Sequence, residues 1–210
     1  MDFKGYFNTI NKNGCPSDCV LKKNGKIALI PPPDEILGIM ISRDPTVRWL
    51  PQYEKYEGNR EKLFETEAIP KLLIRRIAGF MKNYLTENDK EGLYATISQK
   101  TYWTHLHKCF TGAPKKGFTE FKHANAIKCA DQWLSGELDH IINDKPKFIL
   151  ALGKDVEDWV KGWREKRKTE IEIINLLHPS PQNNLIWTRK AKEIIKKTEE
   201  SIWELMKYAR

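Results

Sequence analysis

The sequence contains no apolar run that approaches the roughly 20 residues that a membrane-spanning helix needs. Residues 1–6 also lack the apolar core of a secretory signal peptide. No internal repeat or low-complexity tract is evident. We therefore expect an intracellular, cytoplasmic protein without a membrane partner, and we expect it to work as a monomer.

Cysteine is scarce, and the chain has only four such residues: Cys15, Cys19, Cys109 and Cys129. Because thiols stay reduced inside cells, structural disulfides are not expected. The cysteines then either bind a metal or remain as thiols without a ligand. The cysteines alone leave open a 4Fe–4S cluster, a zinc ion and unliganded thiols.

Hydrophobic residues make up 40% of the chain and charged residues 30%, which is typical of a globular protein. Its 210 residues suit one domain that is large enough to bury a sheet on both faces. The net charge of +8 and the isoelectric point of about 9.2 favour a polyanionic partner, because a Lys or Arg near a phosphate releases counterions. A lysine-rich surface also keeps proteins in solution, so the charge alone leaves the partner open.

Four segments have the composition of strands: 35–42, 100–108, 147–152 and 171–177. Helical spacing of apolar residues predicts helices over 61–84, over 120–143, through Val156 and Trp163, and over 188–210. Residues 1–34 and 46–60 are predicted to be irregular. Strands that alternate with helices predict an α/β fold, with three α/β/α layers around a central four-stranded parallel sheet. Residues 1–210 then form a single domain with a cysteine-bearing N-terminal segment over 1–34.

Parallel strands bring their carboxyl ends to one edge of the sheet, where α/β proteins bind ligands. This edge gathers Asp44, residues 105–109, Gly153 and His178 around one crevice. The two prolines after His178 cannot continue a strand, so they hold the histidine at this edge. A histidine that only caps a turn and a glycine that only ends a strand are the alternatives.

Four motifs, in this order, resemble the uracil-DNA glycosylase superfamily. They are Ile39-Met-Ile-Ser-Arg-Asp-Pro45, Tyr102-Trp-Thr-His-Leu-His-Lys-Cys109, Phe148-Ile-Leu-Ala-Leu-Gly153 and His178-Pro-Ser-Pro181. The places of the cysteines are similar to those in the iron-sulfur (family 4) branch. The resemblance implies a base-excision repair enzyme, a monofunctional DNA glycosylase that hydrolyses the N-glycosidic bond of uracil or another deaminated or damaged base flipped from DNA.

Base excision requires two catalytic groups. Cleavage of the bond builds positive charge on the sugar and negative charge on the base. The carboxylate of Asp44 is suited to stabilise the sugar cation and to orient or deprotonate the attacking water. A ring nitrogen of His178 is suited to donate a hydrogen bond to the base oxygen. We therefore expect Asp44 and His178 to be catalytic.

Beside the flipped base we expect Ser42, Arg43 and His105. The resemblance adds Phe64 as a ring that stacks on the base, with a core aromatic as the alternative. The predicted DNA contacts are Pro179, Ser180, Pro181, Gln182, Arg189 and Lys190. For Arg189 and Lys190, a solvated helix start is the alternative. The resemblance also implies a 4Fe–4S cluster on Cys15, Cys19, Cys109 and Cys129, with zinc as the alternative.

Several positions depart from the family. His105 stands where the family has an asparagine, and a histidine cannot present the adjacent donor and acceptor of an amide. Thr46 replaces a tyrosine that shuts out thymine, and Gln182 stands where a leucine wedge often follows, so that Leu185 is another candidate for the wedge. The motif Gly-Glu-Ala-Pro-Gly of the iron-sulfur branch is absent. A catalytically silent iron-sulfur nucleic-acid-binding protein of the same fold is therefore the alternative.

Overall fold

The computed structural model describes residues 2–11, 14–15, 19, 25–66, 69–112, 120–188 and 192–210. Its centre is a four-stranded sheet in which all neighbouring strands are parallel, in the order β2-β1-β3-β4. The strands are β1 (Gly38–Ser42), β2 (Thr101–His105), β3 (Phe148–Leu152) and β4 (Glu172–Leu176). The predicted four-stranded parallel sheet is confirmed.

Helices cover both faces of the sheet, so every residue of β1, β2 and β3 is buried. Alternate side chains enter two separate cores. Met40 and Leu150 lie in one core, whereas Ile41 and Ile149 lie in the other. This two-sided burial explains why the sequences of β1 and β3 are nearly continuous apolar runs.

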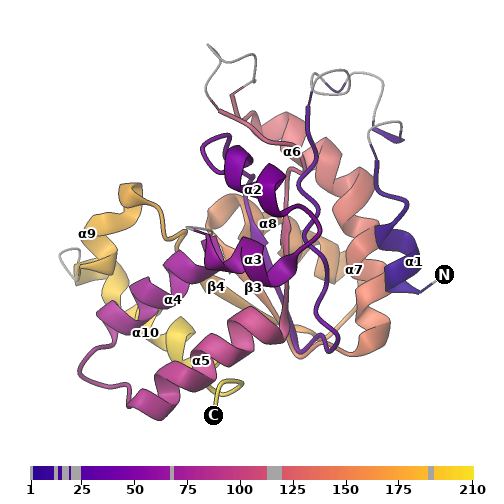
Figure 1. Ribbon diagram of the computed structural model, residues 1–210. Coiled ribbons are helices and arrows are strands. Elements are labelled where there is room, and N and C mark those ends of the chain that lie inside the picture. Colours follow the sequence, from indigo (N-terminus) through magenta and orange to yellow (C-terminus); the bar gives the residue numbers. More distant parts are fainter. Residues whose placement is uncertain are drawn as a thin grey trace.

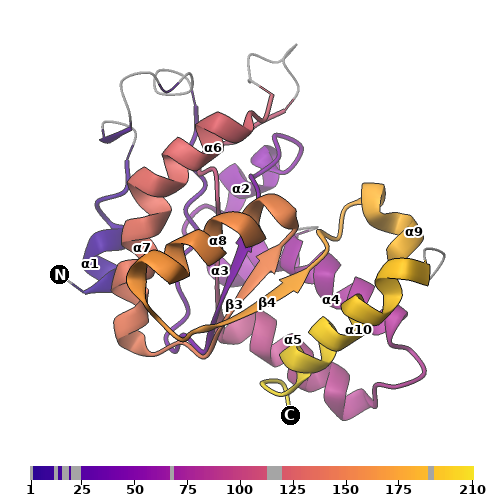
Figure 2. The same ribbon diagram turned by 180° about the vertical axis from the view of Figure 1, so that it is seen from behind.

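Two helical layers enclose the sheet (Figure 1, Figure 2). One layer consists of α2 (Leu50–Tyr56), α3 (Arg60–Glu65), α4 (Ile69–Phe80), α5 (Glu87–Gln99), α9 (Asn184–Trp187) and α10 (Lys192–Met206). The opposite layer consists of α1 (Phe3–Phe7), α6 (His123–Cys129), α7 (Ser135–Ile141) and α8 (Lys154–Arg167). The predicted three layers are confirmed. Within the described ranges, no helix has the length and apolarity to cross a membrane.

Some helix boundaries differ from the predictions. The helix expected over 61–84 is divided into α3 and α4, and α5 was not predicted. A capping box of Thr86 and Asp89 starts α5, and this local signal compensates for its weak apolar periodicity. A π-helical turn (Ala130–Leu134) separates α6 from α7 within the helix expected over 120–143, and a 3-10 turn (Ile142–Asp144) ends it.

The prediction of irregular structure over 1–34 and 46–60 is wrong at two places, where the structure has the helices α1 and α2. The Asp2 side chain caps α1 by accepting from the amide of Gly5 at 2.7 Å. Tyr53 of α2 is buried in the core and donates from its hydroxyl to the carbonyl oxygen of Leu29 at 3.2 Å. These short helices depend on tertiary contacts, which apolar periodicity does not reveal.

Candidate active site

The loop that leaves β1 carries Asp44 at the carboxyl edge of the sheet. Its side chain is only 9% exposed. Arg43 donates from Nε to Oδ1 of Asp44 at 2.6 Å, and the hydroxyl of Thr111 donates to Oδ2. Both carboxylate oxygens thus have a donor, which fixes the plane of the group. The guanidinium of Arg43 also lies over the ring of Phe121, 4.1 Å from its centroid.

His178 stands two residues after the end of β4. Its Nδ1 accepts a hydrogen bond from the backbone amide of Ser180 at 3.3 Å. Its carbonyl oxygen accepts from the side chains of Asn183 at 2.8 Å and Trp187 at 3.3 Å. Hydrogen bonds to its ring and to its carbonyl oxygen therefore hold His178 just beyond the strand end.

The electrostatic surroundings keep His178 neutral. Burial and the positive charge of Arg43 lower the pKa of His178 to about 4, and the opposite effect of Asp44 is smaller. Because Nδ1 accepts from a backbone amide, the proton of the neutral ring lies on Nε2. His178 thus presents a hydrogen-bond donor at neutral pH. The ends of β1 and β4 lie at the same edge of the parallel sheet, with β3 between them, and the charges of Arg43 and Asp44 are near enough to shift the pKa of this ring.

Gly153 ends β3 between these two strand ends. Its φ of +93° lies in the region that favours glycine. The amide of Gly153 donates to the carbonyl oxygen of Leu176 at 2.8 Å, and a Cβ on Gly153 would stand 4.0 Å from the Cβ of His178. Gly153 therefore lets the chain turn into α8 directly beside the histidine.

Ser42 and His105 are paired in register at the ends of β1 and β2. They are 0% and 1% exposed, yet Ser42 Oγ and His105 Nδ1 have no hydrogen-bond partner among the described residues. Burial, followed by the charges of Lys108 and His178, lowers the pKa of His105 well below its usual value. Buried polar atoms normally have partners, and the nearby Nδ1 of His107 is likewise unpaired within the described ranges, so this edge of the sheet holds several unsatisfied polar groups.

Phe64 lies in the core and not at this crevice. Its ring packs edge-to-face on Tyr94 of α5 with the centroids 5.4 Å apart, and it is 6% exposed. It lines a hollow with Ser98 and Gln99, which precede the amino end of β2, whereas His105 is at the carboxyl end. The expectation that Phe64 stacks on a base is corrected to the alternative of a core aromatic.

The residues after His178 form an exposed turn that leads into α9. Pro181 and Gln182 are exposed, whereas Pro179 is buried. Arg76 of α4 anchors this region by donating to the carbonyl oxygen of Pro179 at 3.4 Å and to the side chain of Asn184 at 2.8 Å. Leu185 in α9 is 64% exposed. The predicted contacts Arg189 and Lys190 lie outside the described residues.

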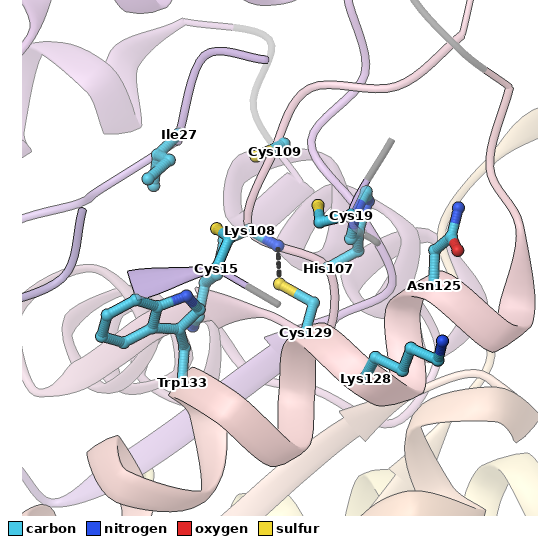
Figure 3. Close-up of a pocket in the computed structure, with 10 residues that line it drawn as sticks. All are labelled: Cys15, Cys19, Ile27, His107, Lys108, Cys109, Asn125, Lys128, Cys129 and Trp133. Carbon is cyan, nitrogen blue, oxygen red and sulfur yellow. Dashed lines mark hydrogen bonds between the residues drawn. The ribbon is translucent and has the colours of Figure 1, made fainter. Parts of the chain in front are cut away.

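The four cysteines line one pocket (Figure 3). They come from the N-terminal segment, from the chain after β2 and from the end of α6: Cys15, Cys19, Cys109 and Cys129. The backbone amide of Lys108 donates to Cys129 Sγ at 3.4 Å, and burial raises the pKa of the Cys129 thiol to about 11.

Four thiols in one pocket provide the donor set of an iron-sulfur cluster. A single metal ion makes a stricter demand, because all of its ligands must converge on one point. In the described part of the chain, no three His, Cys, Asp or Glu side chains have the arrangement that holds one ion.

A family model of the uracil DNA glycosylase superfamily matches residues 56–204, more than half of the chain. The chain belongs to the uracil DNA glycosylase superfamily. Members of this superfamily are in general DNA glycosylases, hydrolases that remove a base from DNA. The matched residues include His178, whereas Asp44 precedes them. No curated protein matches the sequence.

The sequence did not predict three residues that contact the candidate site: Arg76, Thr111 and Phe121. Thr111 contacts Asp44 across 67 positions, and Arg76 contacts Pro179 across 103. The sequence offers a hint only for Thr111, which stands two residues after a predicted ligand, Cys109.

Proposed function

We propose that this protein is a monofunctional DNA glycosylase of base-excision repair. It hydrolyses the N-glycosidic bond of uracil, or of another deaminated or damaged base, after the base is flipped out of DNA. The observation that carries the proposal is that a fixed carboxylate, Asp44, and a neutral histidine, His178, follow strands that end at the same edge of the parallel sheet.

The two residues act on opposite ends of the bond. Asp44 stabilises the developing positive charge of the sugar and accepts a proton from the attacking water. The water oxygen bonds to the sugar C1′ as the bond from C1′ to the base nitrogen breaks, and the electron pair leaves with the base. His178 donates from Nε2 to the base oxygen on which negative charge collects.

We further propose that Ser42 and His105 contact the edge of the flipped base. The support is that Ser42 Oγ and His105 Nδ1 are buried without a hydrogen-bond partner in the described ranges. A hydroxyl group and a neutral imidazole can each donate or accept. This pair therefore accommodates more than one deaminated base, in contrast to an amide with one fixed pattern.

The decisive experiment is a panel of oligonucleotides that carry uracil, hypoxanthine, xanthine or mispaired bases. Alkali cleaves the strand wherever a base has been removed. We expect strand breaks with at least one of these bases. The length of the cleaved fragment shows that the break lies at the modified base.

Asp44→Asn is the matched variant for this panel. The amide keeps the size of the side chain but loses its charge and its basicity, so we expect the rate of base release to fall about 10²- to 10⁴-fold. DNA affinity, measured by fluorescence anisotropy, should stay nearly constant. Equal losses of rate and affinity would contradict the catalytic role of Asp44.

A catalytically silent nucleic-acid-binding protein is the second candidate. The observation that favours it is His105 in place of the family asparagine. Tight binding to DNA without release of any base in the panel would support this alternative. We favour the enzyme, because a protein that only binds DNA needs neither a fixed carboxylate nor a neutral histidine donor at the crevice.

We propose that the cysteine pocket holds a 4Fe–4S cluster, on Cys15, Cys19, Cys109 and Cys129, with zinc as the alternative. The support is that all four thiols line one pocket. The bound cluster would cross-link segments that are distant in the sequence. Brown protein with broad visible absorption and about four irons per chain is expected after anaerobic purification. A colourless protein with one zinc ion per chain would overturn the cluster.

The proposed DNA surface surrounds the turn after His178. Ser180, Pro181 and Gln182 face the phosphates beside the flipped nucleotide, and the buried Pro179 supports the turn from beneath. Arg189 and Lys190, which lie outside the described residues, stay predicted phosphate contacts. Its support is the exposed turn before α9 and the net charge of +8. The 64% exposed side chain of Leu185 is suited to fill the space that the flipped base leaves in the duplex.

A further inference from the structure

Beyond the ends of β1 and β2, the two chain segments stay hydrogen-bonded. The backbone bonds run from Leu106 N to Ser42 O (2.8 Å), from His107 N to Arg43 O (2.9 Å), from Thr111 N to Pro45 O (3.0 Å) and from Val47 N to Thr111 O (3.1 Å). Residues 106–111, here named the strap, therefore run along the loop that carries Asp44.

The strap faces both the cysteine pocket and the proposed catalytic carboxylate. Cys109 is 2% exposed and lines the pocket with the other cysteines. Thr111, two residues further on, is also 2% exposed, and its hydroxyl donates to Oδ2 of Asp44. The anchor of Asp44 and a proposed cluster ligand thus belong to one short segment.

The two donors to Asp44 differ in rigidity. The side chain of Arg43 is 46% exposed and has a long stem whose guanidinium lies over the ring of Phe121, so it is a less rigid donor than a buried, short side chain. Thr111 is buried, and its amide and carbonyl groups are both bonded to the Asp44 loop. A β-branched side chain on such a backbone has few rotamers. Thr111 is therefore the donor that defines the plane of the carboxylate.

We propose that Thr111 is a positioning residue that orients the Asp44 carboxylate toward the cationic sugar. The inference rests on the proposed function of Asp44. Without the Thr111 hydroxyl, Oδ2 loses the hydrogen bond described for it, and the carboxylate can turn toward Arg43. Misplacement of a catalytic group by ~1 Å can cost about 10²-fold in rate.

Two DNA ligands test this orientation without turnover and without knowledge of the excised base. One carries a positively charged pyrrolidine at the abasic position, which mimics the sugar cation, and the other carries a neutral tetrahydrofuran. The wild-type protein is expected to bind the cationic ligand more tightly, because a transition-state mimic gains the charge interaction with Asp44. Equilibrium affinities for both ligands give the preference for the cation.

Thr111→Val keeps the shape of the side chain and removes the donor. We expect the preference for the cationic ligand to fall about ten-fold, the range of a hydrogen bond to a charged group. Affinity for the neutral ligand, the thermal midpoint and the metal content should remain those of the wild type. Thr111→Ser keeps the hydroxyl and should restore the preference.

The outcomes separate this inference from the proposed function. A wild-type protein that shows no preference overturns the proposed role of Asp44, whatever Thr111 does. A wild-type preference that survives in Thr111→Val overturns only the role of Thr111, as does an equal loss of affinity for both ligands. Thr111→Ala replaces the valine variant if that variant does not fold, and a lost preference in Thr111→Ser also contradicts the inference.

Discussion

Burial of His178 makes the stability of the protein depend on pH. Its pKa is about 4 in the folded state against an ordinary value of 6.5. Between these values the unfolded chain binds more protons, so the free energy of unfolding falls as the pH drops from about 6.5 to about 4. At pH 4.5 this residue should account for a loss of ~2 to 3 kcal/mol relative to neutral pH.

His178→Gln tests this contribution by urea unfolding at pH 7.5 and pH 4.5. Between pH 7.5 and pH 4.5, the free energy of unfolding of the variant should fall by ~2 to 3 kcal/mol less than that of the wild type. His123→Gln is the matched control, because the side chain of His123 is 57% exposed. The same acid sensitivity in the wild type and in His178→Gln would contradict the burial argument.

A buried ion pair connects the strap to α7. The side chains of Lys108 and Glu137 are 2% and 0% exposed and contact each other directly. Glu137 also accepts from the hydroxyl groups of Tyr102 at 3.0 Å and Thr104 at 3.2 Å. Lys108→Met leaves Glu137 buried without its counter-charge, so we expect the free energy of unfolding to fall by ~3 to 5 kcal/mol.

Urea unfolding also distinguishes the pair from its parts. The double variant Lys108→Met/Glu137→Leu should recover most of the lost stability, because no unpaired charge remains. Glu200→Ala in the exposed pair of Lys196 and Glu200 is the control and should change stability little. A single variant at Lys108 as stable as the wild type would show that the pair does not hold the strap to α7.

Metal removal should loosen the strap before it loosens the sheet. The strap carries Cys109, whereas β3 is buried between two strands and holds no cysteine. Hydrogen exchange of chelator-treated protein should be at least about ten-fold faster over 106–111, with the amides of β3 unchanged, because local opening costs less than global unfolding. Unchanged protection along the strap would mean that the proposed cluster does not support it.

The net charge of +8 predicts a salt-dependent interaction of the whole molecule with DNA. Each neutralised phosphate releases counterions, so two or more contacts weaken binding about ten-fold or more between 50 and 200 mM salt. Anisotropy titrations over this range of salt concentrations measure the slope of log affinity against log salt concentration. Arg76→Gln should reduce the slope only if Arg76 reaches phosphate; its bonds to Pro179 and Asn184 predict an unchanged slope and a disturbed turn. An affinity independent of salt would contradict the proposed DNA surface.

The fold was predictable from the sequence where the signals are local. Apolar runs that stop near glycine or proline predicted β1, β3 and β4, an alternation of aromatic and polar residues predicted β2, and the alternation of strands with helices predicted the layers. The same reasoning placed Asp44 and His178 at one edge, because both follow strands of a parallel sheet. It failed for α1, α2 and α5, whose residues lack strong apolar periodicity. Phe64 was misplaced because a motif match does not determine which way a helix faces.

The sequence by itself determined the sheet, the edge on which the polar residues gather and the four candidate ligands. Strand patterns and residue types depend only on residues that are close together in the sequence. Only the tertiary structure decided which side chains meet there. The contact of Thr111 with Asp44 spans 67 positions, and the pocket joins cysteines from separate segments. Such contacts depend on how the layers pack, since hydrogen bonds between distant segments form only after the intervening chain has folded. Packing thus placed the strap between the cysteine pocket and the carboxylate.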